Sequence, residues 1–384
     1  MHTQHTHYDY IIVGAGLFGA TFAERAGRAG KRCLVVEKRP HSGGNLYCEQ
    51  VAGIAVHAYG AHIFHTSDRR VWRYVNDLVE FNRYTNSPVA NFYGELYNLP
   101  FNMNTFYRLW GVRTPAEARE RVSREVAEFA NIEPRNLEEQ ALKLVGRDIY
   151  EKLIKGYTEK QWGRPAVELP AFIIKRVPLR FTFDNNYFND TFQGIPVGGY
   201  NPLISKMFER AEVVCGVNFF DDGVRAALEA KLAAGSGKIL YTGKLDEFFG
   251  YKFGRLEYRS LRFETEVLDT PDFQGNAVVN YTDAATPYTR VIEHKHFELS
   301  VPLDANPQTV VTREYPLACS ENCEPYYPVN DAKNNTLFAQ YKTAAGEQKI
   351  AERFLFGGRL ADYAYYDMDK TIARALDVAS AEGL

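Results

Sequence analysis

The chain has 384 residues, of which 45% are hydrophobic and 24% charged, and this length is enough for about two or three domains. Its formal net charge of −3 gives no sequence-wide basic field, so we expect no nucleic-acid partner. No apolar stretch approaches the roughly 20 residues that span a bilayer, and residues 1–7 lack the apolar segment of a signal peptide. The sequence therefore predicts a cytoplasmic protein that does not insert into a membrane.

The cysteines and the histidine-rich start give no sign of a metal site. None of the five cysteines forms a CxxC pair, and Cys319 and Cys323 are too widely spaced for a redox pair and lack a second pair of ligands. Residues 1–7 are predicted to be a disordered tail rather than a metal site. We expect the thiols of such a cytosolic protein to be reduced and partly buried.

The first half of the chain opens on a βαβ-like unit. Residues 8–13 predict a short apolar strand, residues 16–29 a helix of small residues, and residues 32–37 a second strand that ends on an acid. Apolar positions at helical spacing predict a helix over 68–80. Residues 88–99 then predict a β-hairpin.

Residues 101–175 are predicted to be an inserted helical region. The sequence Thr-Pro-Ala-Glu at 114–117 is a capping box with proline at the first helical position. Apolar residues from Leu137 to Leu153 predict another amphipathic helix. From about residue 211 onward short β-rich stretches dominate, and a final helix is predicted from about 367 to 382.

The segment from Gly14 to Gly19 is a GxGxxG pattern that directly follows an apolar strand and opens a helix. Its glycines permit a tight turn, and the N–H groups at the helix start can bind a pyrophosphate. Glu37 ends the next strand, 23 residues after Gly14, where an acid binds ribose hydroxyls and disfavours a 2′-phosphate. The unit therefore predicts FAD or NAD rather than NADP.

A second glycine pair favours FAD over NAD. Gly43 and Gly44 follow the acid within a few residues, so the backbone can approach the cofactor again. This arrangement is typical of flavoproteins of the glutathione-reductase and amine-oxidase type. The late segment 356–359 fits a chain that returns at its end to close over a flavin. We therefore predict FAD as the cofactor.

Together these patterns predict an α/β fold, in which an FAD-binding Rossmann-like domain carries an inserted helical domain and an antiparallel β-sheet domain. The predicted division of the chain is 1–83 (FAD-binding, first part), 84–100 (β-sheet segment), 101–175 (helical domain), 176–210 (linking and FAD-domain segment), 211–245 (FAD-binding, second part), 246–325 (antiparallel sheet domain) and 326–384 (FAD-binding, third part).

Several blocks, which occur in one fixed order along the chain, resemble the UDP-galactopyranose mutase family. Residues 59–66 read YGAHIFHT, 156–163 read GYTEKQWG, and 287–290 read PYTR. Residues 325–328 read PYYP, and 358–369 contain GRL followed by YYDMD. Together these blocks are highly specific, although no single one would be.

The resemblance implies an isomerase that interconverts UDP-galactopyranose and UDP-galactofuranose without net redox change. It implies that FAD is active in its reduced form and that flavin N5 is the nucleophile that attacks the anomeric carbon. This chemistry agrees with the lack of a convincing Ser-His-Asp, Cys-His or paired-carboxylate arrangement in the sequence. The bacterial-type family also suggests a homodimer.

The resemblance implies roles for individual residues. Catalytic roles fall to Arg176, Arg290, His65 and Tyr365. The cofactor set is Gly14, Gly16, Phe18, Gly19, Glu37, Gly43, Gly44, Asn45, Leu46, His62, Arg359, Asp367 and Met368. The substrate set is Asn86, Tyr157, Thr158, Trp162, Arg176, Tyr187, Phe188, Arg259, Asn280, Arg290, Tyr327 and Tyr365.

Two arginines of this set are expected to hold the diphosphate, because a guanidinium gives bidentate charge-assisted hydrogen bonds. Arg176 matches the mobile-loop arginine of the family and Arg290 its fixed one. Without the resemblance, Arg176 would be interpreted as a solvated loop charge, and each aromatic residue of the set could equally be core packing. A zinc site at His62 and His65 is not predicted, because no further ligand stands at a suitable spacing.

The chain departs from the family pattern at two positions, with Ala61 in place of a proline and Ala364 in place of a larger residue. Neither change removes a chemical group that the reaction needs. Two alternatives remain at this point: an FAD-dependent oxidase of the amine-oxidase type, and a non-enzymatic module that binds a flavin or a nucleotide sugar. An oxidase would share the N-terminal pattern but would not need the paired arginines.

Overall fold

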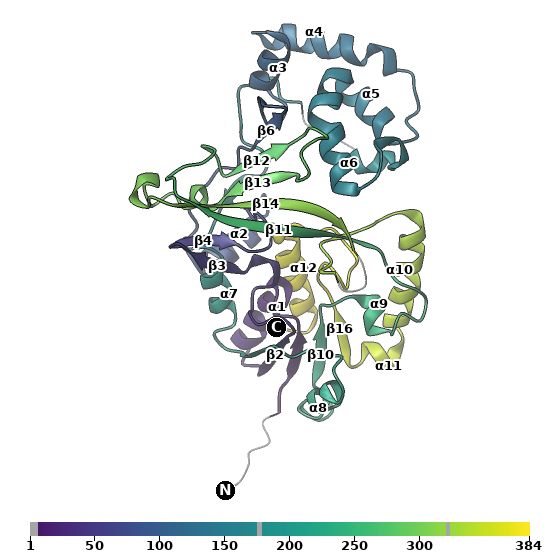
Figure 1. Cartoon of the computed structure of the whole chain (residues 1–384). Coiled ribbons are helices and arrows are strands. Elements are labelled where there is room, and N and C mark those ends of the chain that lie inside the picture. Colours follow the sequence, from purple (N-terminus) through teal and green to yellow (C-terminus); the bar gives the residue numbers. More distant parts are fainter. Residues whose placement is uncertain (1–6, 175–178, 320–322) are drawn as a thin grey trace.

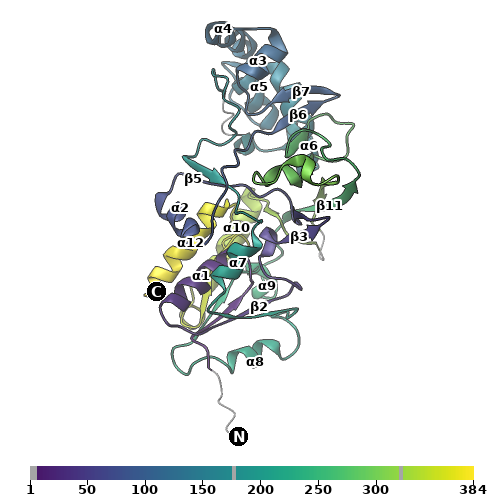
Figure 2. The same cartoon turned by 90° about the vertical axis from the view of Figure 1, so that its left-hand side faces the viewer.

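A computed structural model describes residues 7–174, 179–319 and 323–384. Figures 1 and 2 show a parallel sheet with its helices at the end where the N-terminus lies, and a group of helices at the opposite end. A long antiparallel sheet lies between them. Residues from several distant parts of the sequence contribute to each layer.

The parallel sheet is the first layer. Its strand order is β16 (Phe354–Phe356), β10 (Lys238–Tyr241), β1 (Tyr10–Val13), β2 (Cys33–Glu37) and β9 (Glu212–Cys215), and every neighbouring pair is parallel.

Both faces of this sheet are buried, so its central strands are continuously apolar. Ile12 packs with the core on the side of α1 (Leu17–Arg28) and α12 (Met368–Ala381), while Ile11 packs with a second cluster on the other face. The predicted strand–helix–strand opening is confirmed.

The second layer is a seven-stranded sheet whose longest strands, β11 and β14, pair over ten residues of each. All its neighbours are antiparallel except β12 and β6. Its order is β15 (Tyr327–Pro328), β11 (Tyr258–Leu268), β14 (Thr309–Ala318), β13 (Arg290–Glu293), β12 (Val278–Tyr281), β6 (Val89–Phe92) and β7 (Glu95–Asn98).

The helical layer comprises α3 (Met103–Trp110), α4 (Pro115–Val126), α5 (Leu137–Ile149) and α6 (Gly156–Trp162) around one apolar core. The capping box is confirmed: the Thr114 hydroxyl accepts from the Glu117 N–H, and the Glu117 carboxylate accepts from the Thr114 N–H. The predicted helix from 137 to 153 is interrupted at Gly146, which has a φ of 78°, and continues as a π-helical turn over Tyr150–Lys155.

The predicted helix over 68–80 is shorter than expected, since α2 spans Arg69–Asn76 with Asp68 as its cap. Two small antiparallel pairs join distant segments, β3 (Cys48–Val51) with β4 (Ile54–His57) and β5 (Phe64–Thr66) with β8 (Phe192–Gly194). Helices that were not predicted complete the fold: α7 (Asn201–Met207), α8 (Val224–Glu229), α9 (Leu245–Phe248), α10 (Ala332–Ala345) and α11 (Gln348–Ala351).

The prediction that all five cysteines are reduced thiols is wrong for one pair. Cys319 and Cys323 are joined by a disulfide, with their Cα atoms 5.3 Å apart, which lies in the ordinary range for such a bond. Cys33, Cys48 and Cys215 are free. Sequence spacing excluded a CxxC pair but could not show that the side chains of Cys319 and Cys323 meet.

Among the described helices, none combines the length and the apolar character needed to cross a bilayer.

Candidate active site

A cavity of about 470 Å³ opens beyond the carboxyl ends of three parallel strands, where open α/β sheets bind their ligands. Val13 ends β1, Glu37 ends β2 and Tyr241 ends β10, and all three line it. The cavity gathers most of the predicted cofactor residues: Gly14, Gly16, Phe18, Glu37, Gly43, Gly44, Asn45, Leu46, His62, Arg359 and Met368.

The floor of this dinucleotide cavity is bare backbone. Gly14 has a φ of +106°, and a Cβ there would lie 2.1 Å from the Thr242 Oγ1. A Cβ on Gly44 would lie 2.9 Å from the Cα of Gly16, so the two glycine-rich turns meet without side chains. In the described part of the chain no side chain caps α1, whose first N–H groups therefore stay available to an anion. This cradle fits the pyrophosphate of a dinucleotide.

We expect Gly14→Ala to weaken flavin binding by roughly tenfold or more, because a Cβ would both clash with Thr242 and strain the turn. Gly30→Ala is the matched control, since Gly30 also has a positive φ but a Cβ added there would meet nothing within 4 Å. Flavin titration of the apoproteins would measure both. Equal affinity in wild type and Gly14→Ala would contradict the assignment of this turn to the cofactor.

Glu37 is fixed at the edge of the cavity by backbone N–H groups. Its Oε2 accepts from Ala15 at 2.8 Å and its Oε1 from Arg39 at 3.0 Å. The carboxylate therefore holds the glycine turn and the end of β2 together. Contact with a ribose stays a prediction for this residue.

Two predicted cofactor residues do not line the cavity. Gly19 lies within α1, where a Cβ would come 2.3 Å from the Gly14 carbonyl oxygen, so it lets the helix pack closely on the turn. Asp367 is the N-cap residue of α12, and burial raises the pKa of its carboxyl group. Both residues shape the surroundings of the cavity.

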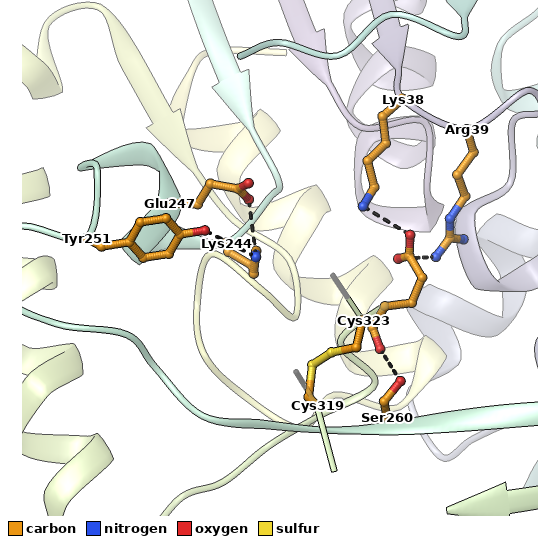
Figure 3. Close-up of a disulfide and its surroundings, with 9 residues drawn as sticks. Lys38, Arg39, Lys244, Glu247, Tyr251, Ser260, Cys319 and Cys323 are labelled. Atoms are coloured by element: carbon orange, nitrogen blue, oxygen red, sulfur yellow. Dashed lines mark hydrogen bonds and ion pairs between the residues drawn. A yellow bond between two sulfur atoms is a disulfide. The ribbon is translucent and has the colours of Figure 1, made fainter. Parts of the chain in front are cut away.

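The sequence did not predict a pair of salt bridges at the rim of the cavity, here named the clasp, which joins Glu324 to Lys38 and Arg39 (Figure 3). The Glu324 carboxylate lies 3.1 Å from Lys38 and 2.9 Å from Arg39, and its carbonyl oxygen accepts from the Ser260 hydroxyl at 2.7 Å. Burial raises the pKa of Glu324, but Arg39 and Lys38 outweigh that effect and hold the pKa below its ordinary value. The clasp joins the end of β2 to the segment that follows the disulfide.

Several of the other lining residues that were missed come from the segments after β9 and β10. A strand running into Thr242 and Gly243 repeats the strand-then-glycine signal of Gly14 and could have been found. The lining residues outside the predicted cofactor set are Val13, Leu17, Val36, Lys38, Arg39, Val217, Asn218, Phe219, Phe220, Tyr241, Thr242, Gly243, Lys244, Glu247, Cys323, Glu324, Pro325, Gly358, Leu360, Tyr366 and Thr371.

A second group, here named the Arg290 cluster, consists of Arg290, Tyr157 and Glu314. The guanidinium Nη2 of Arg290 donates to the Tyr157 hydroxyl at 2.8 Å, and its Nε lies 3.3 Å from the Glu314 Oε1. The Arg290 side chain keeps 24% of its surface exposed, whereas Glu314 keeps 2%. Burial lowers the pKa of Arg290, but Glu314, Tyr157 and Tyr327 together outweigh that effect and hold the pKa well above the ordinary value. A charged guanidinium is thus fixed in advance, with part of its surface open.

Electrostatic interactions connect this cluster with the cavity. Burial lowers the pKa of His62 to about 4, and the positive charges of Arg359 and Arg290 add to that effect. His62 is therefore neutral near neutral pH. Arg359 also lies 5.9 and 5.8 Å from the ring centroids of Tyr327 and Tyr365, whose rings stack 5.6 Å apart. Both tyrosines also interact electrostatically with Arg290, so they connect the cavity with the Arg290 cluster.

Two predicted substrate residues carry unused polar atoms. The Oδ1 atoms of Asn86 and Asn280 are buried and have no hydrogen-bond partner among the described residues. Buried amide oxygens cost free energy when unpaired, so a ligand that donates to them would be stabilised. Unpaired buried oxygens of this kind are expected at a site that binds a polar ligand.

Three further predicted substrate residues lie in or beside α6. Thr158 and Trp162 are in α6 with Tyr157, and the Arg259 Nε donates to the backbone carbonyl of Gln161 in that helix at 3.1 Å. Arg259 therefore lies beside the end of α6.

His65, on β5, stacks on Phe188 with ring centroids 3.7 Å apart, and its Nδ1 lies 2.7 Å from the Asp190 Oδ2. Tyr187 is next to Phe188 and is exposed. The predicted partner of Arg290, Arg176, lies outside the described residues.

The family model described as UDP-galactopyranose mutase matches residues 152–365, which is more than half of the chain. The chain belongs to the UDP-galactopyranose mutase family. The model of an NAD(P)-binding Rossmann-like domain matches residues 12–78 and covers the glycine turns. The predicted family and fold class are confirmed.

Curated relatives extend over nearly the whole chain. A probable UDP-galactopyranose mutase of Klebsiella pneumoniae is 39% identical over 374 residues, which cover 97% of this chain and 94% of that protein. A dTDP-fucopyranose mutase of Escherichia coli is 38% identical over 376 residues, covering 96% and 97%. The chain is thus similar to relatives named for two different nucleotide sugars.

Solved structures confirm the fold. One is a crystal structure of a reduced UDP-galactopyranose mutase, with a TM-score of 0.71 and 15% identity. The match covers 97% of this chain and 93% of that chain. Another is a putative protoporphyrinogen oxidase from Exiguobacterium, with a TM-score of 0.59 and 13% identity. That match covers 97% of this chain and 98% of the oxidase chain. The architecture is therefore shared with proteins named as oxidases, and the fold alone does not separate a mutase from an oxidase.

Proposed function

We propose that this protein binds FAD and interconverts UDP-galactopyranose and UDP-galactofuranose. The observation that supports the proposal most is the preset Arg290 cluster close to the dinucleotide cavity, because an isomerase that releases and recaptures a diphosphate needs a fixed cation beside its cofactor. Bound FAD, in its reduced form, would supply a nucleophilic N5 atom for the anomeric carbon. The glycine cradle and the free N–H groups of α1 would hold its pyrophosphate.

In this proposal the residues of the chain bind the substrate, orient the groups that contact it and neutralise the charge of its diphosphate. Arg290 binds the diphosphate and stabilises its negative charge as the bond to the sugar breaks. Tyr157 orients the guanidinium from α6, and Glu314 holds it from the sheet behind. Arg176 adds a second cation by family resemblance. His65, which Asp190 orients through Nδ1, and Tyr365 complete the proposed catalytic set.

The test is turnover by the dithionite-reduced holoprotein supplied with UDP-galactofuranose. We expect UDP-galactopyranose to form, no stoichiometric reductant to be used, and the flavin spectrum to be that of the reduced state before and after. No turnover by the reduced protein, or equal turnover by the oxidised protein, would refute the proposal. Reoxidation or reduction of the flavin by the sugar itself would favour the oxidase alternative.

A second candidate function is the same isomerisation of dTDP-fucopyranose, favoured by the Escherichia coli relative with that name. The two substrates differ by a base methyl, a ribose hydroxyl and a sugar hydroxyl. Parallel assays with both furanose substrates would decide between them. We expect the higher kcat/KM with UDP-galactofuranose, and the reverse order would assign the second function.

We also propose a homodimer in the cytoplasm, following the bacterial-type family. Analytical ultracentrifugation of the holoprotein would test the oligomeric state.

A further inference from the structure

The ammonium group of Lys160, in α6, is tied to the loop that joins β12 to β13. Its Nζ donates to the carbonyl oxygens of Tyr281, Thr286 and Tyr288 at 2.8, 3.0 and 3.0 Å. Because an ammonium has three donors, each of its N–H groups is engaged by this loop. Arg290 follows two residues after the last of these carbonyls.

The same helical segment holds the loop at two further points. Lys152 lies in the π-helical turn that precedes α6, and Gly156 and Lys160 lie one turn apart in α6. The Thr282 hydroxyl donates to the Lys152 carbonyl oxygen at 2.7 Å. A Cβ on Gly156 would lie 2.4 Å from the Thr282 carbonyl oxygen, so helix and loop touch backbone to backbone there. Lys160 adds a charged contact to these two points.

The loop and the helix also meet at the candidate active site. Tyr157, one residue after Gly156, accepts the hydrogen bond from Arg290 at 2.8 Å. A shift of the loop relative to α6 would therefore move the guanidinium away from the hydroxyl that orients it. Asp283 stabilises the loop itself, since its Oδ1 accepts from the N–H groups of Ala285 and Thr286.

We propose that Lys160 is a positioning residue, whose ammonium fixes the loop that leads into Arg290 against α6 and so places the guanidinium for the diphosphate of the nucleotide sugar. This inference rests on the function proposed above. Lys160 acts through Arg290 and contacts neither substrate nor cofactor in this account. An apolar side chain such as that of methionine would leave three backbone carbonyls without their donor.

The charge of this group changes in an accessible pH range. Burial lowers the pKa of Lys160 from 10.5 to about 8, and the carboxylate of Asp283 opposes that shift. The other ionisable groups nearby in the described chain are the phenols of Tyr281 and Tyr288, and Glu159 on α6, whose Oε1 accepts from the Ala166 N–H. A neutral amine keeps only two donors, so one carbonyl loses its partner above this pH. Activity should therefore be present below pH 8 and fall above it.

Stability should change in the opposite direction. The pKa of Lys160 is lower in the folded protein than in the unfolded chain, so the unfolded chain binds more protons between about pH 8 and pH 10.5. This group alone therefore makes the folded state more stable as pH rises through that window. A loss of turnover there would not come from unfolding caused by Lys160.

The experiment compares the reduced holoenzyme as wild type, Lys160→Arg, Lys160→Met and the control Lys155→Met. Lys155 lies on the same helical segment but pairs with exposed Glu151. We expect kcat/KM of the wild type to fall above an apparent pKa near 8. Lys160→Arg should move this alkaline limb of the pH profile, the fall in kcat/KM, to higher pH, because a guanidinium stays charged. Lys160→Met should lose roughly 10- to 100-fold in kcat/KM at neutral pH and show no limb, and Lys155→Met should match wild type.

UDP affinity, measured by fluorescence titration of the same proteins, separates this inference from the proposed function. If the wild type shows no mutase turnover but Lys160→Met binds UDP about tenfold more weakly, the function fails and the positioning role stands. Wild-type UDP affinity and kcat/KM in Lys160→Met would overturn the inference. An unchanged alkaline limb in Lys160→Arg would also overturn it, and this comparison decides the matter even if the methionine variant does not fold.

Discussion

Arg290→Ala is expected to lower kcat/KM by roughly 10²-fold or more, the scale of removing a preorganised charged donor. The guanidinium is held before substrate arrives by the Tyr157 hydroxyl at 2.8 Å and by Glu314 at 3.3 Å, so its charge needs no reorganisation during the reaction. Arg290→Lys should recover little of the loss, because an ammonium cannot reproduce the planar fork of donors. Steady-state kinetics of the reduced variants with UDP-galactofuranose would measure the effect.

Arg313→Ala is the matched control for that variant. Arg313 lies in the neighbouring strand β14 and pairs with Glu266 at 2.9 Å on the exposed part of the same sheet. Removing a surface partner of this kind should leave kcat/KM close to wild type. Flavin content should be normal in both variants, since neither residue lines the dinucleotide cavity. A kcat/KM for Arg290→Ala equal to that of the control would contradict the role assigned to Arg290.

Local sequence signals predicted the parts of the fold that depend on neighbouring residues. The glycine turn after β1, the capping box of α4 and the hairpin of β6 and β7 each rest on residues within one short segment. α10 was missed because its apolar residues do not follow one helical face, so no periodic signal marks it. Gly146 interrupts a helix whose apolar pattern continues on both sides, and the pattern therefore concealed the break.

The residues of the candidate site could be predicted where they belong to a sequence motif. They could not be predicted where only the folded chain brings them together. The glycines and Glu37 could be named from their spacing alone, and they gather around one cavity. The clasp between Arg39 and Glu324 joins residues 285 positions apart, and no local pattern can pair them. Glu314 reads as one polar residue in a strand, and its importance appears only when β13 and β14 bring it opposite Arg290.

Glu314→Gln is expected to lower the free energy of unfolding by roughly 2–4 kcal/mol, somewhat less than for a fully buried ion pair because Arg290 keeps exposed surface. The amide preserves shape but leaves the guanidinium without its counter-charge inside the sheet, where burial already raises the pKa of Glu314 and Arg290 opposes that rise. Urea denaturation at a fixed, saturating flavin concentration would measure the change. The control is Glu266→Gln, which loses an exposed pair with Arg313 and should stay within about 1 kcal/mol of wild type.

Loss of the counter-charge should also lower the catalytic activity, because Glu314 would no longer fix the position of the Arg290 guanidinium. We expect kcat/KM of Glu314→Gln to fall by roughly 10- to 100-fold, while flavin content stays normal. The double variant Arg290→Met with Glu314→Leu removes both charges, so it should be more stable than Glu314→Gln although inactive. A double variant less stable than Glu314→Gln would show that the two side chains stabilise the sheet through packing, and the ion-pair account of the Arg290 cluster would then be wrong.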